Sequence, residues 1–291
     1  MSRWLRWTGY LFLALAAFLT LGGILLYVIT SRDIHHVYTF GDSSVRATRD
    51  SASLVRGRHL VEAIAKCQEC HGDDYGGKLL SDSRVFGRLA AGNITAGRGG
   101  TARFTDADWE RALRHGVGPG GRALVFMPSE AFTAMSDDDL AALIGYLRTI
   151  PPVDREWPAP EIGPLARVLY LKGGFPLLPA TIIDHGAPRR PPASGVTIEY
   201  GEYLATVGGC RGCHGSGLDG TGAPDAPDLT RRRLATWTDA DFIRALRQGV
   251  RPDGGAIDPT KMPWRRSGRM TDDEILAVWS YVRSLPERPA A

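Results

Sequence analysis

The sequence predicts an all-α protein, with one N-terminal transmembrane helix followed by two tandem helical domains of the same construction. Three observations support this fold class. A charge-free apolar run opens the chain, the remainder contains an internal duplication, and both copies carry helix-capping sequences, whereas no strand pattern of any length appears. The expected organisation is a membrane anchor over residues 1–32, a first domain over 50–152, a proline-rich linker over 153–195 and a second domain over 196–288.

The first 32 residues are expected to anchor the chain in a membrane. No charged residue lies between Trp7 and Thr30, and this run matches the roughly 20 residues that cross a bilayer core. The alternative is a cleaved signal peptide, but the run is too long for one and no Ala-x-Ala site follows it. Arg3 and Arg6 precede the run, so the positive-inside rule keeps the N-terminus in the cytoplasm. We therefore expect a single pass through the inner membrane, with the rest of the chain in the periplasm.

Two copies of one pattern follow the anchor. Each contains, in the same order, a Gly-x-x-Leu sequence, a Cys-x-x-Cys-His unit, a short polar loop that ends in Thr, a Thr-Asp-Ala-Asp sequence and a Met-Pro pair. Matching landmarks in a fixed order are the signature of a duplicated structural unit. The landmarks begin at Gly57, Cys67, Gly92, Thr105 and Met127 in the first copy, and at Gly201, Cys210, Pro227, Thr238 and Met262 in the second.

The duplicated sequences also predict where helices begin. Thr105 and Thr238 are expected as N-caps, because an aspartate stands three residues later in the place of the capping-box acid and an aromatic residue precedes each cap. Ser136 and Thr271 are expected to cap the last helix of each copy, where apolar residues recur at helical spacing. Glycines at 116 and 249 are expected to end the preceding helices.

The segment between the copies is expected to be a linker. The stretch from Pro151 to Pro192 holds ten of the chain's 19 prolines and therefore cannot form one helix. Its middle is fairly apolar, but the prolines, glycines and basic residues there argue against a second membrane span. We expect it to wrap over one domain or to pack between the two; a role in partner docking or at the membrane surface stays open.

Two Cys-x-x-Cys-His units predict the cofactor. In a helical turn both cysteines face the same way and can form thioether bonds to one porphyrin, and the next residue then places an imidazole on the iron. A zinc ribbon would need its cysteine pairs about 15–20 residues apart, and a redox dithiol would need a βαβ context; neither condition is met. The sequence thus predicts two haem c groups, held by Cys67, Cys70 and His71 in the first copy and by Cys210, Cys213 and His214 in the second.

Each copy offers two methionines for the sixth iron position, where a thioether opposite histidine raises the reduction potential. Met127 and Met262 each precede a proline in a loop, whereas Met135 and Met270 stand directly before the cap of the last helix. The second pair is explained by helix-end packing, a role that any apolar side chain can fill. Met127 and Met262 are therefore the expected iron ligands.

These features resemble class I cytochrome c domains. The resemblance covers the Cys-x-x-Cys-His units, the polar loops at 93–95 and 228–230, and the Met-Pro pairs before a capped last helix, but neither the first 50 residues nor the linker. In these details the domains are most similar to the cytochrome c subunits of periplasmic alcohol and aldehyde dehydrogenases, which typically carry three haem domains where this chain carries two. The resemblance implies a cytochrome c fold and electron relay, without naming a donor.

The expected function is therefore electron transfer without catalysis of its own. No open iron site is left if both haems are six-coordinate, and all four cysteines are used, so no catalytic residue is predicted. The alternative is a dihaem redox enzyme of the peroxidase type, which would need an open iron. Redox partner proteins are expected, whether a dehydrogenase, a quinol-oxidising complex or a terminal oxidase. The chain is expected to work either as a separate carrier or as a subunit of a respiratory or dehydrogenase complex. A formal net charge of +3 over 291 residues gives no case for nucleic acid.

Other candidate residues have simpler interpretations. His115 and His59 correspond to Gln248 and Tyr203 in the second copy, so both are expected to make polar contacts rather than to bind iron. An arginine cluster near Met262 is expected either to be solvated or to form a docking patch for an acidic partner. Its members are Arg231, Arg232, Arg233, Arg265, Arg266 and Arg269.

Overall fold

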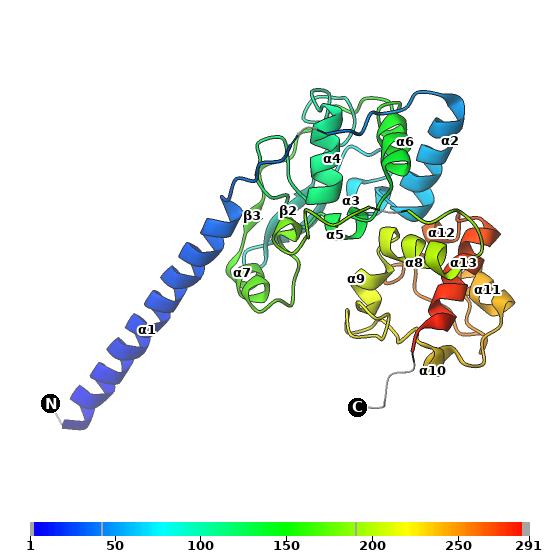
Figure 1. Cartoon of the computed structure of the whole chain (residues 1–291). Coiled ribbons are helices and arrows are strands. Elements are labelled where there is room, and N and C mark those ends of the chain that lie inside the picture. The colour runs from blue at the N-terminus through cyan, green and yellow to red at the C-terminus, as the bar shows by residue number, and fades with distance from the viewer. Residues whose placement is uncertain (1–2, 42, 190, 287–291) are drawn as a thin grey trace.

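A long helix projects from a body made of two mostly helical domains (Figure 1). This computed structural model describes residues 3–41, 43–189 and 191–286, so the expected domain limits at 1–2 and 287–288 lie outside the described residues. Among the described residues, helix α1 (Arg3–Ile34) is long and apolar enough to cross a membrane. None of its most apolar stretch is buried inside the protein. The helix runs two residues beyond the expected end at Arg32.

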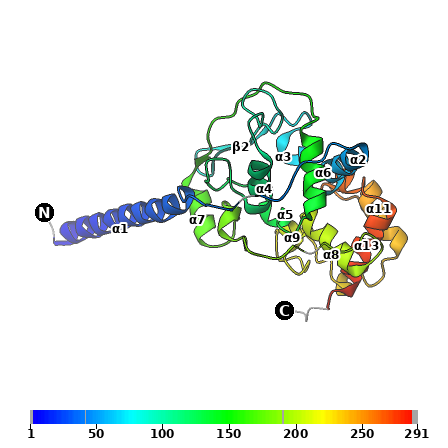
Figure 2. The same ribbon diagram turned by 45° about the horizontal axis from the view of Figure 1, so that its top comes forward.

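The two domains repeat one helical plan. Each begins with a helix that leads into a short helical turn, continues through a loop, and ends with a capped helix (Figures 1 and 2). The first domain contains α2 (Ser51–His59), the π-helix η1 (Leu60–Ile64), α3 (Gln68–His71), α4 (Asp106–His115), α5 (Ser129–Phe132) and α6 (Asp137–Leu147). The second contains α8 (Ile198–Val207), α9 (Cys210–His214), α10 (Arg231–Leu234), α11 (Asp239–Gln248), α12 (Trp264–Ser267) and α13 (Asp272–Ser284).

The predicted caps are confirmed. Thr105 and Thr238 close capping boxes at α4 and α11, and Thr271 does so at α13 with a glutamate. The Ser136 hydroxyl accepts a hydrogen bond from the third residue of α6. Gly116 ends α4 in the left-handed region at φ 64°, and its counterpart ends α11 at φ 66°.

The first and last helices of each domain cross at a glycine, which explains the duplicated Gly-x-x-Leu sequence. A Cβ on Gly57 would lie 2.0 Å from the Ala142 carbonyl oxygen, and one on Gly201 would lie 1.9 Å from that of Ala277. The backbone of α2 therefore touches α6, and α8 touches α13 in the same way. Only glycine permits such an approach.

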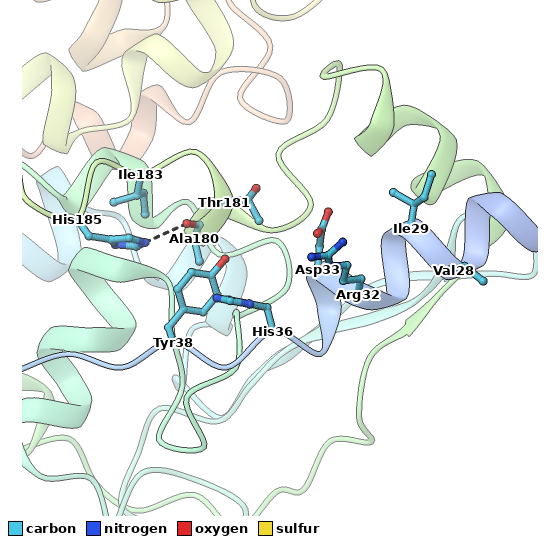
Figure 3. Close-up of a pocket in the computed structure, with 10 residues that line it drawn as sticks. All are labelled: Val28, Ile29, Arg32, Asp33, His36, Tyr38, Ala180, Thr181, Ile183 and His185. Atoms are coloured by element: carbon cyan, nitrogen blue, oxygen red, sulfur yellow. Dashed lines mark hydrogen bonds between the residues drawn. The ribbon is translucent and has the colours of Figure 1, made fainter.

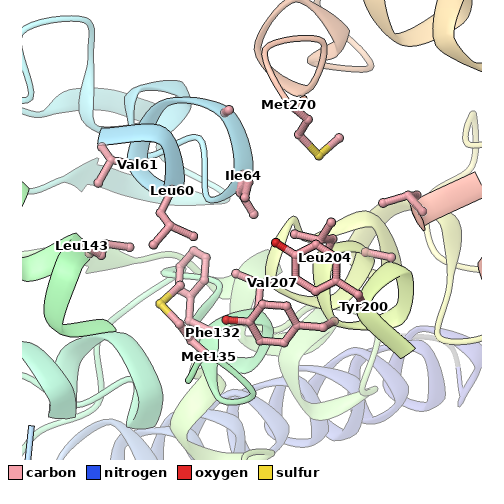
Figure 4. Packing of buried hydrophobic residues seen from close by; sticks show 14 of the residues in the cluster. Leu60, Val61, Ile64, Phe132, Met135, Leu143, Tyr200, Leu204, Val207 and Met270 are labelled. Carbon is pink, nitrogen blue, oxygen red and sulfur yellow. The ribbon is translucent and has the colours of Figure 1, made fainter. Parts of the chain in front are cut away.

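One hydrophobic core joins both domains. Figure 4 shows Leu60 and Ile64 of η1 and Phe132 of α5 next to Leu204 and Val207 of α8, and all of these belong to one buried cluster. The domains are therefore packed against each other rather than strung on a flexible chain.

A small antiparallel sheet in the first domain departs from the prediction, because no strand pattern was seen in the sequence. Strand β1 (Lys78–Ser83) pairs with β2 (Gly87–Ala91), and β2 pairs with the two-residue β3 (Glu161–Ile162). The strands are short, and β1 buries no residue, so the apolar–polar alternation that marks a half-buried strand never develops.

The linker packs over the first domain. The Val153 carbonyl accepts a hydrogen bond from the Asn93 side chain at 2.6 Å, and the Trp157 indole donates to the Gly76 carbonyl at 2.9 Å. Further along, the Leu177 carbonyl accepts from the backbone of Phe126 at 2.8 Å, directly before Met127. The linker thus braces two loops of that domain.

A helix within the linker also holds the end of α1. Helix α7 (Pro164–Leu171) starts with the proline that favours a first helical position. Its Tyr170 hydroxyl donates to Asp33 at 2.9 Å, and its Arg167 lies over the Tyr27 ring and donates to the Thr30 hydroxyl. A cavity of about 660 Å³ adjoins this junction. It lies between the end of α1 and the 3-10 turn η2 (Pro179–Thr181), which follows α7 in the linker (Figure 3).

His115 is buried in an aromatic cluster beside that cavity. Its ring stacks on Phe40 with centroids 4.3 Å apart, and its Nδ1 lies 3.0 Å from Nδ1 of His185 in the linker. Burial, followed by the positive charge of Arg189 and of His185, lowers the pKa of His115 to about 4. The cluster therefore ties the segment after α1, helix α4 and the linker together through a neutral imidazole.

This lowered pKa predicts a pH-dependent stability. Between about pH 6.5, the ordinary histidine pKa, and about 4, the unfolded chain binds a proton that the folded chain excludes. Stability is therefore full above that window and falls with pH inside it, by at most about 1.4 kcal/mol per pH unit. Replacing His115 with glutamine, the residue at the equivalent position, should flatten this part of the dependence. Thermal unfolding of the unmodified protein and of His115→Gln, measured between about pH 4 and pH 6.5, tests this prediction. Stability that falls equally with pH in the two proteins would contradict it.

Candidate haem sites

Both Cys-x-x-Cys-His units form single helical turns at the ends of longer helical segments. Cys67 is the N-cap of α3, which follows η1 closely, and Cys210 opens α9, which follows α8. All four cysteines lie in the described part of the chain and are free thiols. Burial raises the pKa of Cys67 to about 12 and raises that of Cys70 and of Cys210, so these thiols are held in the neutral form.

The histidine of each unit is oriented by a backbone carbonyl. His71 Nδ1 lies 2.7 Å from the Gly92 carbonyl oxygen, and His214 Nδ1 lies 2.9 Å from that of Pro227. Because a carbonyl only accepts, Nδ1 must carry the proton and Nε2 is left with its lone pair. Burial lowers the pKa of both histidines, although the carbonyl bond opposes this, so the neutral imidazole is favoured. This is the tautomer and orientation of a metal-binding histidine.

The duplicated polar loops position those carbonyls. The Asn93 side chain accepts a hydrogen bond from the Thr95 N–H at 2.9 Å, and Asp228 accepts from the Thr230 N–H at 2.7 Å. Such a side-chain turn fixes the backbone of the residue that precedes it. That residue is Gly92 in the first copy and Pro227 in the second, and its carbonyl contacts the histidine Nδ1. The sequence marked these loops as matching landmarks but not their role; the only available signal was a turn-forming residue at the same place in both copies.

The two Met-Pro loops have the same backbone. Pro128 has φ −77° and ψ 54°, and Pro263 has φ −78° and ψ 51°. The carbonyl of Met127 accepts from Ser129 N–H, and that of Met262 accepts from the residue two positions on, both at 2.7 Å. Both methionines are partly buried and pack against the core cluster to which Cys67 and Cys210 also pack.

The other two methionines are core residues. Met135 has 0% of its surface exposed and Met270 has 7%, and both belong to the joint core cluster (Figure 4). The donor set at each unit therefore fits a covalently attached haem: two thiols on one turn, an imidazole with Nε2 free, and a half-buried thioether on a separate loop.

The domains meet through a pseudo-symmetric pair of polar contacts. The Tyr203 hydroxyl donates to Asp139, the third residue of α6, at 2.7 Å, and His59 contacts Glu274, the third residue of α13, at 2.6 Å. His59 thus makes a polar contact, as expected, but across the interface. Arg266 also belongs to this interface, since it pairs with Glu69 and Asp73 beside the first Cys-x-x-Cys-His unit, so it is not available to a docking patch.

Two protein-family models match this chain, one in each half. The model described as cytochrome c oxidase, cbb3-type, subunit III matches residues 52–147, and the model described as cytochrome c matches residues 198–286. The chain is also similar to a solved structure of reduced recombinant cytochrome c4 from Pseudomonas stutzeri. The identity is 19% and the TM-score 0.23, with 82% of this chain and 100% of that chain covered.

Three relatives indicate the range of similar proteins. The alcohol dehydrogenase (quinone) cytochrome c subunit of Komagataeibacter europaeus is 29% identical, over 82% of this chain and 57% of the relative. The fructose dehydrogenase cytochrome subunit of Gluconobacter japonicus is 25% identical, over 83% of this chain and 54% of the relative. A diheme cytochrome c-type protein of Cereibacter sphaeroides is 28% identical, over 72% and 75%. The chain thus spans little more than half the length of the two dehydrogenase subunits.

Proposed function

Because this chain is a c-type cytochrome with one cytochrome c domain in each half, we propose that it relays electrons through two haem c groups and catalyses no reaction of its own. The observation that carries this proposal is duplicated: in both domains a carbonyl holds Nδ1 of the histidine and leaves Nε2 for iron. A bound haem supplies a one-electron iron couple. The residues of this chain attach it, set its axial ligands and shield it from water.

We propose His71 with Met127, and His214 with Met262, as the two pairs of axial ligands. The support is that Met135 and Met270 are used in the core, while the Met-Pro methionines share one loop geometry in both copies. A thioether ligand stabilises ferrous iron and so raises the potential. It also fills the sixth position, which leaves no open site for a substrate such as peroxide.

Replacing Met127 or Met262 with alanine is expected to convert one of two low-spin haems to a high-spin or differently ligated form and to lower its potential. Visible and electron paramagnetic resonance spectra during a redox titration measure both effects. Met135→Leu is the matched control, since it conserves core volume and should keep two low-spin haems. A five-coordinate, high-spin haem in the resting unmodified protein would contradict the proposal.

We further propose that α1 anchors the chain in the inner membrane, with both haem domains in the periplasm, where it accepts electrons from a dehydrogenase. The length and apolarity of α1 support its role as a membrane anchor. The dehydrogenase cytochrome subunits among the relatives of this chain support a dehydrogenase as the electron donor. Quinone or a terminal oxidase would then accept the electrons. Capture of the chain from detergent-solubilised membranes should recover a dehydrogenase, and deletion of residues 1–34 should move the chain to the soluble fraction. Capture of the chain alone, or a deletion variant that stays in the membrane, argues against this assignment.

A further inference from the structure

The two haem-attachment turns are joined by one side chain, that of Lys66. Its ammonium group donates to the Ile64 carbonyl at 2.8 Å and to the Gly208 carbonyl at 2.6 Å. Ile64 ends η1 three residues before Cys67, and Gly208 caps α8 two residues before Cys210. Figure 4 shows Ile64 and Val207 on the two sides of the interface, and both belong to the joint core cluster. Lys66 therefore bridges the ends of two helical segments, where the unpaired carbonyls favour a cation.

The backbone at Lys66 points to a specific use of this side chain. Lys66 has φ 51°, in the left-handed region that residues with a Cβ rarely adopt. The equivalent residue of the second domain, directly before Cys210, is Gly209 with φ 70°. The turn thus requires a left-handed residue at this position, and glycine satisfies it in one copy without strain. In the first copy the same turn is made by a residue with a Cβ, and the side chain that this residue supplies makes the two contacts described above.

The charge of Lys66 lies close to both attachment sites. Lys66 is next to Cys67 in the chain, and its ammonium contacts the carbonyl two residues before Cys210. Burial lowers the pKa of Lys66, and the Glu69 carboxylate opposes this shift. A positive charge near a haem disfavours the ferric state, which carries one more positive charge than the ferrous state.

We propose that Lys66 is a positioning residue for electron transfer between the two haems: it holds the two attachment turns together and places a positive charge between them. The charge raises both reduction potentials together, so it favours acceptance of an electron from a donor without widening the difference in potential between the two haems. This inference rests on the proposed two-haem function, and its test is read from potentials rather than from activity.

The experiment compares redox titrations of the full-length holoprotein and four variants, after haem content has been measured. Lys66→Met removes the charge and keeps most of the stem, and Lys66→Gly also removes the strain. Both should lower both midpoint potentials, by about tenfold in the reduction equilibrium constant, which is 59 mV for one electron. Lys66→Arg keeps the charge and should keep both potentials. Lys172→Met, on the exposed end of α7, removes an equal charge elsewhere and is the matched control.

Any of three outcomes would overturn the inference. The first is that Lys66→Met and Lys66→Gly have the same midpoint potentials as Lys172→Met, and the second is that only the potential of the haem in the first domain changes. A fall in the Lys66→Arg variant equal to that in Lys66→Met would likewise remove charge as the cause. Failure of the underlying function looks different, because the unmodified protein would then lack two low-spin haems.

Discussion

Replacing Cys67 and Cys70 together with alanine is expected to halve the covalently bound haem, leaving one haem, on the second domain. The two thiols share one turn and lie beside a histidine whose Nε2 is free, so their removal abolishes both thioether bonds and leaves iron ligation as the only hold. Mass spectrometry of the intact chain measures the covalent haem directly, and a pyridine haemochrome spectrum counts it.

The duplication supplies the matched control for this experiment. Cys210→Ala with Cys213→Ala should also leave one haem, attached to the first domain, and the two variants should differ in their remaining potential. A chain that keeps two covalent haems after the first pair is removed would contradict the assignment. Stoichiometric zinc in the unmodified protein, with no haem, would contradict the assignment more strongly. The cysteines would then form a zinc site, which the spacing of the two cysteine pairs argues against.

The sequence predicted most of the features that depend on neighbours within one turn. Capping needs only a hydroxyl and an acid three residues apart, and Thr105, Thr238 and Thr271 were read correctly from that spacing. The position directly before a helix cap distinguished Met135 from Met127, and the structure places Met135 in the core, as that position indicated.

Features that depend on distant residues could not be read in this way. His59 and Glu274 are 215 positions apart, and nothing in either local sequence indicates that they meet across the domain interface. The small sheet was missed because its strands are too short to show a period, and β3 joins it from the linker. The role of Lys66 could not be predicted for a similar reason. It depends on a hydrogen bond to the distant Gly208 carbonyl and on a left-handed backbone φ, neither of which the sequence indicates.

The glycine at the helix crossing leads to the second large effect: Gly57→Ala is expected to destabilise the first domain by about 3 kcal/mol, at the upper end of overpacking costs. The added Cβ would lie 2.0 Å from the Ala142 carbonyl oxygen and 2.9 Å from the Tyr146 Cβ. The nearest obstacle is backbone inside a helix, which cannot swing away as a long side chain can. The helices must therefore separate, and the core between them loosens.

Thermal unfolding of the holoprotein measures this cost, which for a domain of this size corresponds to a fall in Tm of roughly 12–24 °C. Gly120→Ala is the matched control in the same domain, because no other atom lies within 4 Å of a Cβ there. Similar melting of the two variants would contradict the crossing. Gly201→Ala should repeat the effect in the second domain, where the Ala277 carbonyl stands 1.9 Å from the added Cβ. Since α2 leads through η1 to Lys66 and Cys67, a displaced α2 should also disturb the first haem, and the spectrum of that haem then reports the shift independently of stability.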